Sequence, residues 1–189
     1  MRCALFDRFP LQCHLRAMLF VCLFLFLVML VAVNYAFALS GYPVSFMESQ
    51  LSFSGEKIKT HFAMMTSEEI VIYKIAQLVD YLYIFIYVLL IFSIGIFLGR
   101  FFPNRSKKRC LGYSCAIFGV VAGLCDIIEN FFILLMSSDP MGFPNFYAIL
   151  HSFFASIKFT LLGFSICLIL ISLLLIIFTI KINNWKKRR

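Results

Sequence analysis

Four long apolar stretches alternate with shorter polar segments along the chain. The apolar stretches cover about 17–39, 76–102, 111–136 and 148–180. Each reaches the roughly 20 helical residues that cross a hydrocarbon core. The longest polar segment, 40–75, separates the first two. This pattern predicts an all-α, polytopic membrane protein with four transmembrane helices, folded as a single membrane domain over residues 1–189.

Composition supports this class of protein. Apolar residues make up 62% of the chain and charged residues 14%, against roughly 45–50% and about 25% in soluble domains. Such a chain has too little polar surface to cover a soluble globule. Soluble enzymes and nucleic-acid-binding domains are therefore excluded, and nucleic acid is not expected as a partner. The lipid bilayer is the first expected partner.

The net charge of +8 is unevenly placed along the chain. Basic residues dominate three segments, which are 2–16, 100–109 and 181–189, whereas segment 40–75 carries four Glu against three Lys. Loops rich in Lys and Arg stay in the cytoplasm. The pattern predicts that both termini and the second connection are cytoplasmic, and that segment 40–75 is external. An alternative for the first stretch is a signal peptide cleaved after Ala38, but its apolar run is longer than the usual 7–15 residues.

The external segment contains two local signals. Leu51–Phe53 and Ile58–Thr60 flank the turn-like sequence Ser54-Gly55-Glu56-Lys57, which favours a short hairpin. Thr66 followed by Glu69 resembles a capping box. The second long helix is therefore expected to begin near Ser67 and to extend beyond the membrane.

Seven polar or charged residues fall inside the apolar stretches, where they are costly and are expected to face the bundle interior. They form the predicted buried polar cluster: Asn34, Asp80, Asp126, Glu129, Asn130, His151 and Lys158. At 1.5 Å per residue, Asp126 lies about 22 Å and Glu129 about 27 Å from the start of the third stretch. The other members also fall in the external half. We therefore expect all four helices to contribute to one polar layer.

The third stretch also contains small residues at helical spacing. Gly112, Ala116, Gly119 and Gly123 continue into Asp126 and Asn130 on one stripe. Small residues on a stripe allow close helix packing. In the fourth stretch, His151, Ala155, Lys158 and Ser165 share a face. Packing faces and polar residues therefore coincide.

Three members of the cluster have plainer interpretations. Lys158 could snorkel to the outer interface, and Asp80 could be an interfacial residue at the bundle mouth. His151 is interpreted first as a wetted interface residue, with a role as a base or ligand as the alternative. For Asp126, Glu129 and Asn130, the sequence favours a functional or tertiary role, because three polar residues in five positions suit a membrane span poorly.

The sequence GLCDIIENFFILLMSSDP, followed by AILHSFFASIKFTLLG, resembles a group of uncharacterised small bacterial four-helix integral membrane proteins. They carry a D-x-x-E-N motif in the third helix and a Lys in the fourth. The resemblance covers about 50 residues and implies a bacterial cytoplasmic (inner) membrane. It singles out Asp126, Glu129, Asn130 and Lys158, and it implies no activity.

Several functions remain open from the sequence. The first is a structural or accessory membrane component, in which the cluster locks the third helix to the fourth and other membrane proteins are the partners. The second is an enzyme or binder for an outer-leaflet lipid or polyprenyl substrate, with Asp126 or Glu129 as base, Lys158 as electrostatic stabiliser and His151 as proton shuttle. The third is a proton-coupled transporter component.

A divalent metal is the weakest hypothesis. Asp80, Asp126, Glu129 and His151 offer suitable ligand atoms, but Lys158 would repel a cation. No metal site is therefore predicted, and the sequence identifies no cofactor.

Overall fold

The computed structural model describes residues 6–7, 9–104 and 106–187, and every regular element in them is helical. Four helices are long: α2 (Gln12–Leu39), α5 (Ser67–Phe101), α6 (Lys107–Ser138) and α7 (Asn145–Lys187). Two are short: α3 (Phe46–Gln50) and α4 (Gly55–Ala63). All four long helices are long and apolar enough to cross a membrane. The prediction of an all-α chain with four membrane-length helices is confirmed.

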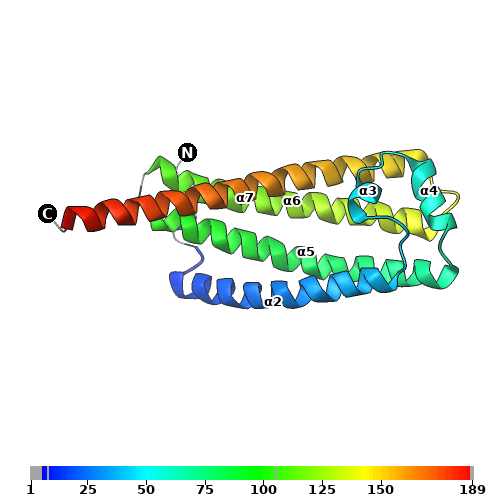
Figure 1. The fold of residues 1–189 in the computed structure, drawn as a ribbon, viewed down its shortest axis with the longest axis horizontal. Helices are drawn as coiled ribbons and strands as arrows, with labels where there is room; N and C mark the ends of the chain where they lie inside the picture. The colour runs from blue at the N-terminus through cyan, green and yellow to red at the C-terminus, as the bar shows by residue number, and fades with distance from the viewer. Residues whose placement is uncertain (1–5, 8, 105, 188–189) are drawn as a thin grey trace.

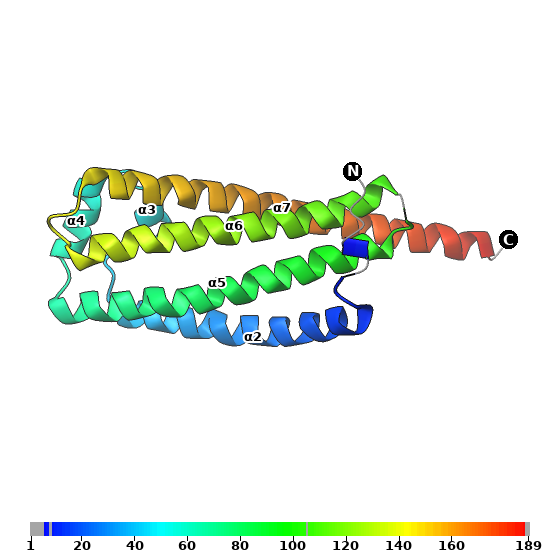
Figure 2. The same ribbon diagram turned by 180° about the vertical axis from the view of Figure 1, so that it is seen from behind.

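The long helices run side by side along the molecule (Figures 1 and 2), and each packs mainly on the next one along the chain. Helices α5 and α6 form the inner pair. In the apolar 18-residue stretch of each that could cross a membrane, 44% of the residues are buried. The corresponding share is 11% in α2 and in α7. The outer two helices therefore present most of their apolar surface outward, as lipid-facing helices do.

Both ends of the bundle are distinct (Figure 1). The terminal end holds the start of α2, the connection between α5 and α6, and the end of α7, which extends past the other helices. There, Arg100 donates from Nε to the Phe6 carbonyl oxygen at 2.9 Å and from Nη1 to that of Pro10 at 2.6 Å. Arg109 pairs with Asp7 at 2.8 Å. These contacts fasten the segment before α2 to the inner helices.

The opposite end is covered by the cap, which we define as residues 40–66 and which contains α3 and α4 (Figure 2). It ends in the predicted capping box. The Glu69 amide donates to Thr66 Oγ1 at 3.2 Å, and the Thr66 amide donates to Glu69 Oε2 at 2.7 Å. The prediction that the second long helix begins near Ser67 is confirmed, because this reciprocal pair satisfies two amide groups at the helix start.

The predicted hairpin within the cap is wrong. Residues 55–63 form α4 instead, because Ser54 accepts from the Lys57 amide as an N-cap and Glu56 lies in the first turn. Helix α4 is then held to α7 from outside. The Gly55 amide donates to Asn145 Oδ1 at 2.6 Å, and the Phe53 amide donates to Ser152 Oγ at 3.0 Å.

An apolar core joins the cap to the bundle. Its buried members include Ile58, Phe62, Tyr73, Met136 and Phe143. Tyr42 stacks on Tyr73 at 4.7 Å between ring centroids and contacts Ser49 and His61 through its hydroxyl group. Burial raises the pKa of Tyr42 to about 12, and burial lowers the pKa of His61. Both side chains are therefore neutral near pH 7 and belong to the packed interior of the cap.

Close helix contact accounts for the small-residue stripe. Gly112 lies against Gly95 and Gly99 of α5, so that an added Cβ would overlap their backbone atoms. An added Cβ on Gly123 would overlap Val88. Gly119 meets Ile91 in the same way, and Ala116 is fully buried beside Gly95. The stripe brings α6 close to α5 and thereby sets the position of Asp126 on the same face.

Candidate functional site

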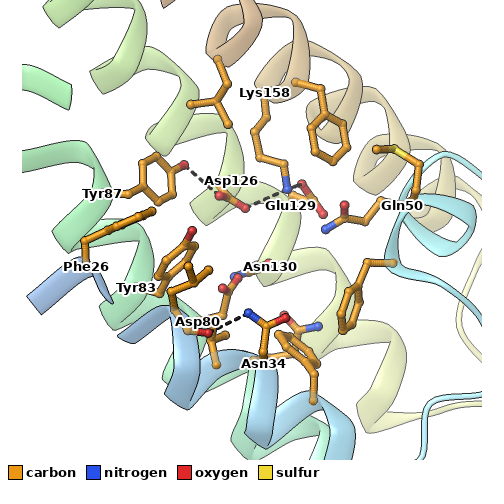
Figure 3. Close-up of a pocket in the computed structure, with 18 of the residues that line it drawn as sticks. Phe26, Asn34, Gln50, Asp80, Tyr83, Tyr87, Asp126, Glu129, Asn130 and Lys158 are labelled. Atoms are coloured by element: carbon orange, nitrogen blue, oxygen red, sulfur yellow. Dashed lines mark hydrogen bonds and ion pairs between the residues drawn. The ribbon is translucent and has the colours of Figure 1, made fainter. Parts of the chain in front are cut away.

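Lys158 of α7 lies between two carboxylates of α6 (Figure 3). Its Nζ is 3.0 Å from Asp126 Oδ1 and 2.5 Å from Glu129 Oε2. The exposed fractions of the whole residues are 5% for Lys158, 6% for Asp126 and 0% for Glu129. An ammonium ion removed from water needs such partners, and so do the carboxylates. The snorkelling interpretation of Lys158 therefore does not describe this structure.

Helix α5 completes the cluster from the opposite side. Tyr87 donates from its hydroxyl group to Asp126 Oδ2 at 2.8 Å, so both oxygens of Asp126 are engaged. Asn130 of α6 donates to Asp80 Oδ2 at 2.7 Å, and Asp80 is half-buried. The cluster thus combines an ion-paired part on α6 and α7 with a hydrogen-bonded part on α5 and α6.

His151 is buried, with 2% of its surface exposed. The interpretation of this residue as a wetted interface side chain is therefore wrong, because the cap covers this end of α7 and removes it from solvent. Its Nδ1 lies 3.3 Å from the Glu129 carbonyl oxygen. A carbonyl oxygen can only accept, so we assign the proton of the neutral ring to Nδ1, which makes Nε2 an acceptor.

Asn34 departs from the prediction of a buried cluster member. It is exposed, and its Nδ2 donates to the Leu30 carbonyl oxygen of its own helix at 2.7 Å. The reason is the arrangement of helices, because α2 packs mainly on α5 and leaves most of its surface outside. The other six predicted residues, Asp80, Asp126, Glu129, Asn130, His151 and Lys158, line one cavity together with Asn34.

This cavity has a volume of about 730 Å³ and lies among all four long helices and α3. Its polar part is toward the cap, where Gln50 of α3 points at the cluster (Figure 3). Its other walls are aromatic and aliphatic and include Phe26, Leu90 and Leu162. Mostly apolar cavities of 300–1,000 Å³ with a few convergent polar groups are typical of small-molecule sites.

The cavity reaches the surface between α2, α3 and α7. Four of its lining residues are exposed: Asn34, Phe46, Met47 and Ile166. Because α2 and α7 flank the inner pair and present apolar side chains outward, this mouth opens sideways, where the hydrocarbon of a bilayer would lie.

Three buried polar atoms in the cavity lining have no partner among the described residues. They are Glu129 Oε1, Gln77 Oε1 and His151 Nε2. Leaving a buried polar atom unpaired costs about 1–3 kcal/mol. Such atoms are expected at a position that a ligand or water completes.

Sequence reasoning did not assign Tyr87 or Gln77 to the cluster. Tyr87 nevertheless shares a helix face with Asp80, seven residues earlier. The signal was present, because Tyr73, Gln77, Asp80, Ile84 and Tyr87 follow a 4-3-4-3 spacing on α5. All five are buried or line the cavity.

A metal site does not follow from this geometry. Within the part of the chain that the structure describes, no three His, Cys, Asp or Glu side chains are grouped so that they could hold a metal ion. Lys158 occupies the space between Asp126 and Glu129 that a cation would need.

The fold and the site together define a class: a helical bundle with four candidate membrane-spanning helices, of multi-pass type, enclosing a charged cavity within its apolar part. Comparisons of the chain with protein-family models, curated proteins and solved structures find no match. The function is therefore argued from the site itself.

Proposed function

We propose that this protein binds a membrane amphiphile, with the polar head at the Asp126–Glu129–Lys158 cluster and the apolar chain along the cavity. The observation that carries the proposal is a cavity whose one end holds unpartnered buried polar atoms and whose other walls are apolar. An amphiphile has the same division. The sideways mouth between α2 and α7 supports a ligand that arrives from the lipid phase.

The structural-lock hypothesis explains part of the site. The ion pairs from Lys158 to Asp126 and Glu129 join α6 to α7 and fix their relative position. A lock alone needs neither the cavity nor the unpartnered atoms of Glu129 and His151. We therefore treat the lock as the support that positions the head group.

Transport and catalysis are supported less well. The lining of this cavity toward the terminal end is apolar, with Leu90, Ile94 and Ile166, so among the described residues its charged part ends at the cluster. A proton path needs that part to continue. The cluster contains acid–base groups, but its lysine is engaged by two carboxylates and no activated nucleophile accompanies them. Binding is the function that the geometry supports best.

The proposed setting is the cytoplasmic membrane of a bacterium, with both termini in the cytoplasm. Arg100, Lys107, Lys108 and Arg109 lie at the terminal end, whereas the charges of the cap balance, with Glu48 and Glu56 against Lys57 and Lys59. This distribution supports the orientation given by the positive-inside rule. The cavity would then open in the outer half of the bilayer.

A cavity-filling substitution tests the proposed function. Native mass spectrometry of the protein purified in a mild detergent is expected to show a bound amphiphile that extraction can identify. Leu162 lines the cavity and is half-buried, so Leu162→Trp is expected to abolish this bound mass.

Leu161→Trp is the matched control. Leu161 is also half-buried on α7 but does not line the cavity, so its variant is expected to retain the ligand. Equal occupancy in the Leu162 variant and the wild type would contradict the proposal. So would a wild-type protein that carries no amphiphile and binds none when lipids are added.

A further inference from the structure

The unpartnered atoms of the cavity share one chemical property, which is that all three accept hydrogen bonds. Glu129 Oε1 and Gln77 Oε1 are carboxylate and amide oxygens, and neither can donate as such. His151 Nε2 is an acceptor because the proton of the neutral ring is on Nδ1, facing the Glu129 carbonyl oxygen. A ligand that satisfies this site must therefore bring hydrogen-bond donors.

The charged residues of the cavity lining also favour a ligand that brings hydrogen-bond donors. Its charged lining residues are three acids, Asp80, Asp126 and Glu129, and one base, Lys158. The ammonium group of Lys158 is already contacted by two carboxylates, and Tyr87 donates to one of them. An anionic head group would meet a surplus of carboxyl groups. A cationic head group would compensate that surplus at Glu129 Oε1, because Lys158 contacts Oε2 of the same carboxylate and leaves Oε1 without a partner.

Aromatic rings line the cavity beside the acids. Phe26 of α2 stacks on Tyr83 of α5 with ring centroids 5.5 Å apart, and Tyr83 lies 5.6 Å from Tyr87 (Figure 3). The faces of such rings attract ammonium groups. The rings also form a surface along which methylene groups can pack.

The apolar walls extend from the cluster toward the terminal end. Ile166 follows Lys158 by two helical turns on α7, a rise of about 12 Å. Ile166 is also exposed at the mouth. A chain attached to a head group at Glu129 could therefore lie along α7 and pass into the surrounding lipid.

Resting on the proposed function, we infer that the ligand is a lipid-like amphiphile with a primary ammonium head group. The ammonium contacts Glu129 Oε1, and the acceptors Gln77 Oε1 and His151 Nε2 lie in the same lining for the remaining donors. The aliphatic chain occupies the apolar walls. Commitment to a lipid source follows from those walls and from the sideways mouth, since a short soluble amine would use neither.

Matched decyl probes test the head group. The full-length protein, stripped of bound lipid in a neutral detergent, is titrated with decylamine, decyltrimethylammonium, decanoate and decanol, and with ethylamine as the amine without a chain. Binding is read by native mass spectrometry and by the shift in thermal midpoint. We expect decylamine to bind at least tenfold more tightly than each of the other probes.

Two variants connect the preference to named atoms. Glu129→Gln is expected to reduce decylamine affinity at least tenfold. Because it also removes one partner of Lys158, Gln77→Met serves as a second variant that leaves the ion pairs in place, with an expected loss of about fivefold, as for one hydrogen bond. Thr160→Val is the control, since Thr160 does not line the cavity and its hydroxyl group bonds to its own helix, and affinity should be unchanged.

Each other outcome overturns a defined part of the inference. Decanoate or decanol binding as tightly as decylamine overturns the cationic head group and leaves amphiphile binding standing. Equal binding of decyltrimethylammonium overturns the requirement for N–H donors. Equal binding of ethylamine overturns the lipid source. If no probe and no lipid binds, the proposed function itself fails. Unchanged decylamine affinity in both the Glu129 and Gln77 variants overturns the assigned position.

Discussion

At the scale of single residues, Lys158 has the most consequential position in the molecule. Among the described residues that line the cavity, it alone supplies an ammonium group, and it pairs with two carboxylates of the neighbouring helix. A buried ion pair adds little net stability compared with apolar residues of similar size, but removing one member leaves an uncompensated charge. The cluster therefore makes the bundle sensitive to single substitutions and tolerant of concerted ones.

We expect Lys158→Met to lower the free energy of unfolding by about 3–5 kcal/mol, because Asp126 and Glu129 lose their counter-ion. The triple variant Asp126→Asn, Glu129→Gln, Lys158→Met removes all three charges and should recover most of that loss. Thermal unfolding in detergent measures both. Glu56→Gln, which breaks the exposed pair with Lys59, is the control and should cost less than about 1 kcal/mol. A Lys158 variant as stable as the wild type would contradict a charged cluster.

Much of the cluster could be predicted residue by residue. Asp126, Glu129 and Lys158 stand out because charges inside apolar stretches need a reason. Asn34 stands out equally, but its side chain bonds to the backbone of its own helix. Whether Asn34 faces the cluster depends on how α2 packs, which the sequence does not reveal. Gln77 lay just inside a predicted span and carried no charge. Its role depends on which acceptors lack partners, and a sequence cannot show that.

At the scale of elements, hydropathy predicted the four long helices but not their ends. Helix α7 has 43 residues, or about 65 Å, more than twice a hydrocarbon core of about 30 Å. Residues 51–60 of the cap were expected to form a hairpin, because turn-forming residues also serve as helix N-caps. In the structure Ser54 caps α4, and Gly55 bonds to Asn145 of α7.

The contact between α5 and α6 gives a prediction with an internal control. Gly123→Val is expected to lower the thermal midpoint strongly, because its side chain would overlap Val88 and push the two helices apart. Overpacking of this kind typically costs about 1–3 kcal/mol. Gly163 of α7 has no atom within 4 Å of an added Cβ, so Gly163→Ala should be neutral or stabilise by up to about 1 kcal/mol. Equal effects of the two variants would show that α6 does not pack through its glycine stripe.

At the scale of the whole molecule, the fold places the start of α2, the connection between α5 and α6, and the end of α7 on one side. The cap lies on the other (Figure 1). An even number of crossings requires the first part of this arrangement, whichever way the bundle is inserted. Which side is cytoplasmic follows only from the proposed orientation.

Single-cysteine variants test that orientation. Cys110 is exposed at the terminal end, and Glu56 of the cap is exposed. In intact cells a membrane-impermeant maleimide is expected to label a variant carrying only Glu56→Cys and to leave one carrying only Cys110 unlabelled. Opening the cells should make Cys110 reactive, which controls for its accessibility. The reverse pattern would place the cap and the cavity mouth on the cytoplasmic side.

Contacts between residues far apart in the sequence also determine when the site can form during synthesis. Asp126 and Lys158 are 32 residues apart, so at about 5–20 residues per second the acids of α6 are made about 2–6 s before their counter-ion. The contact that holds the cap forms later still. Phe53 precedes Ser152 by 99 residues, which corresponds to about 5–20 s. Helix α7 is made after α6 and the cap, and it supplies the counter-ion of Asp126 and the contact that holds Phe53, so the site is completed only once α7 has been made.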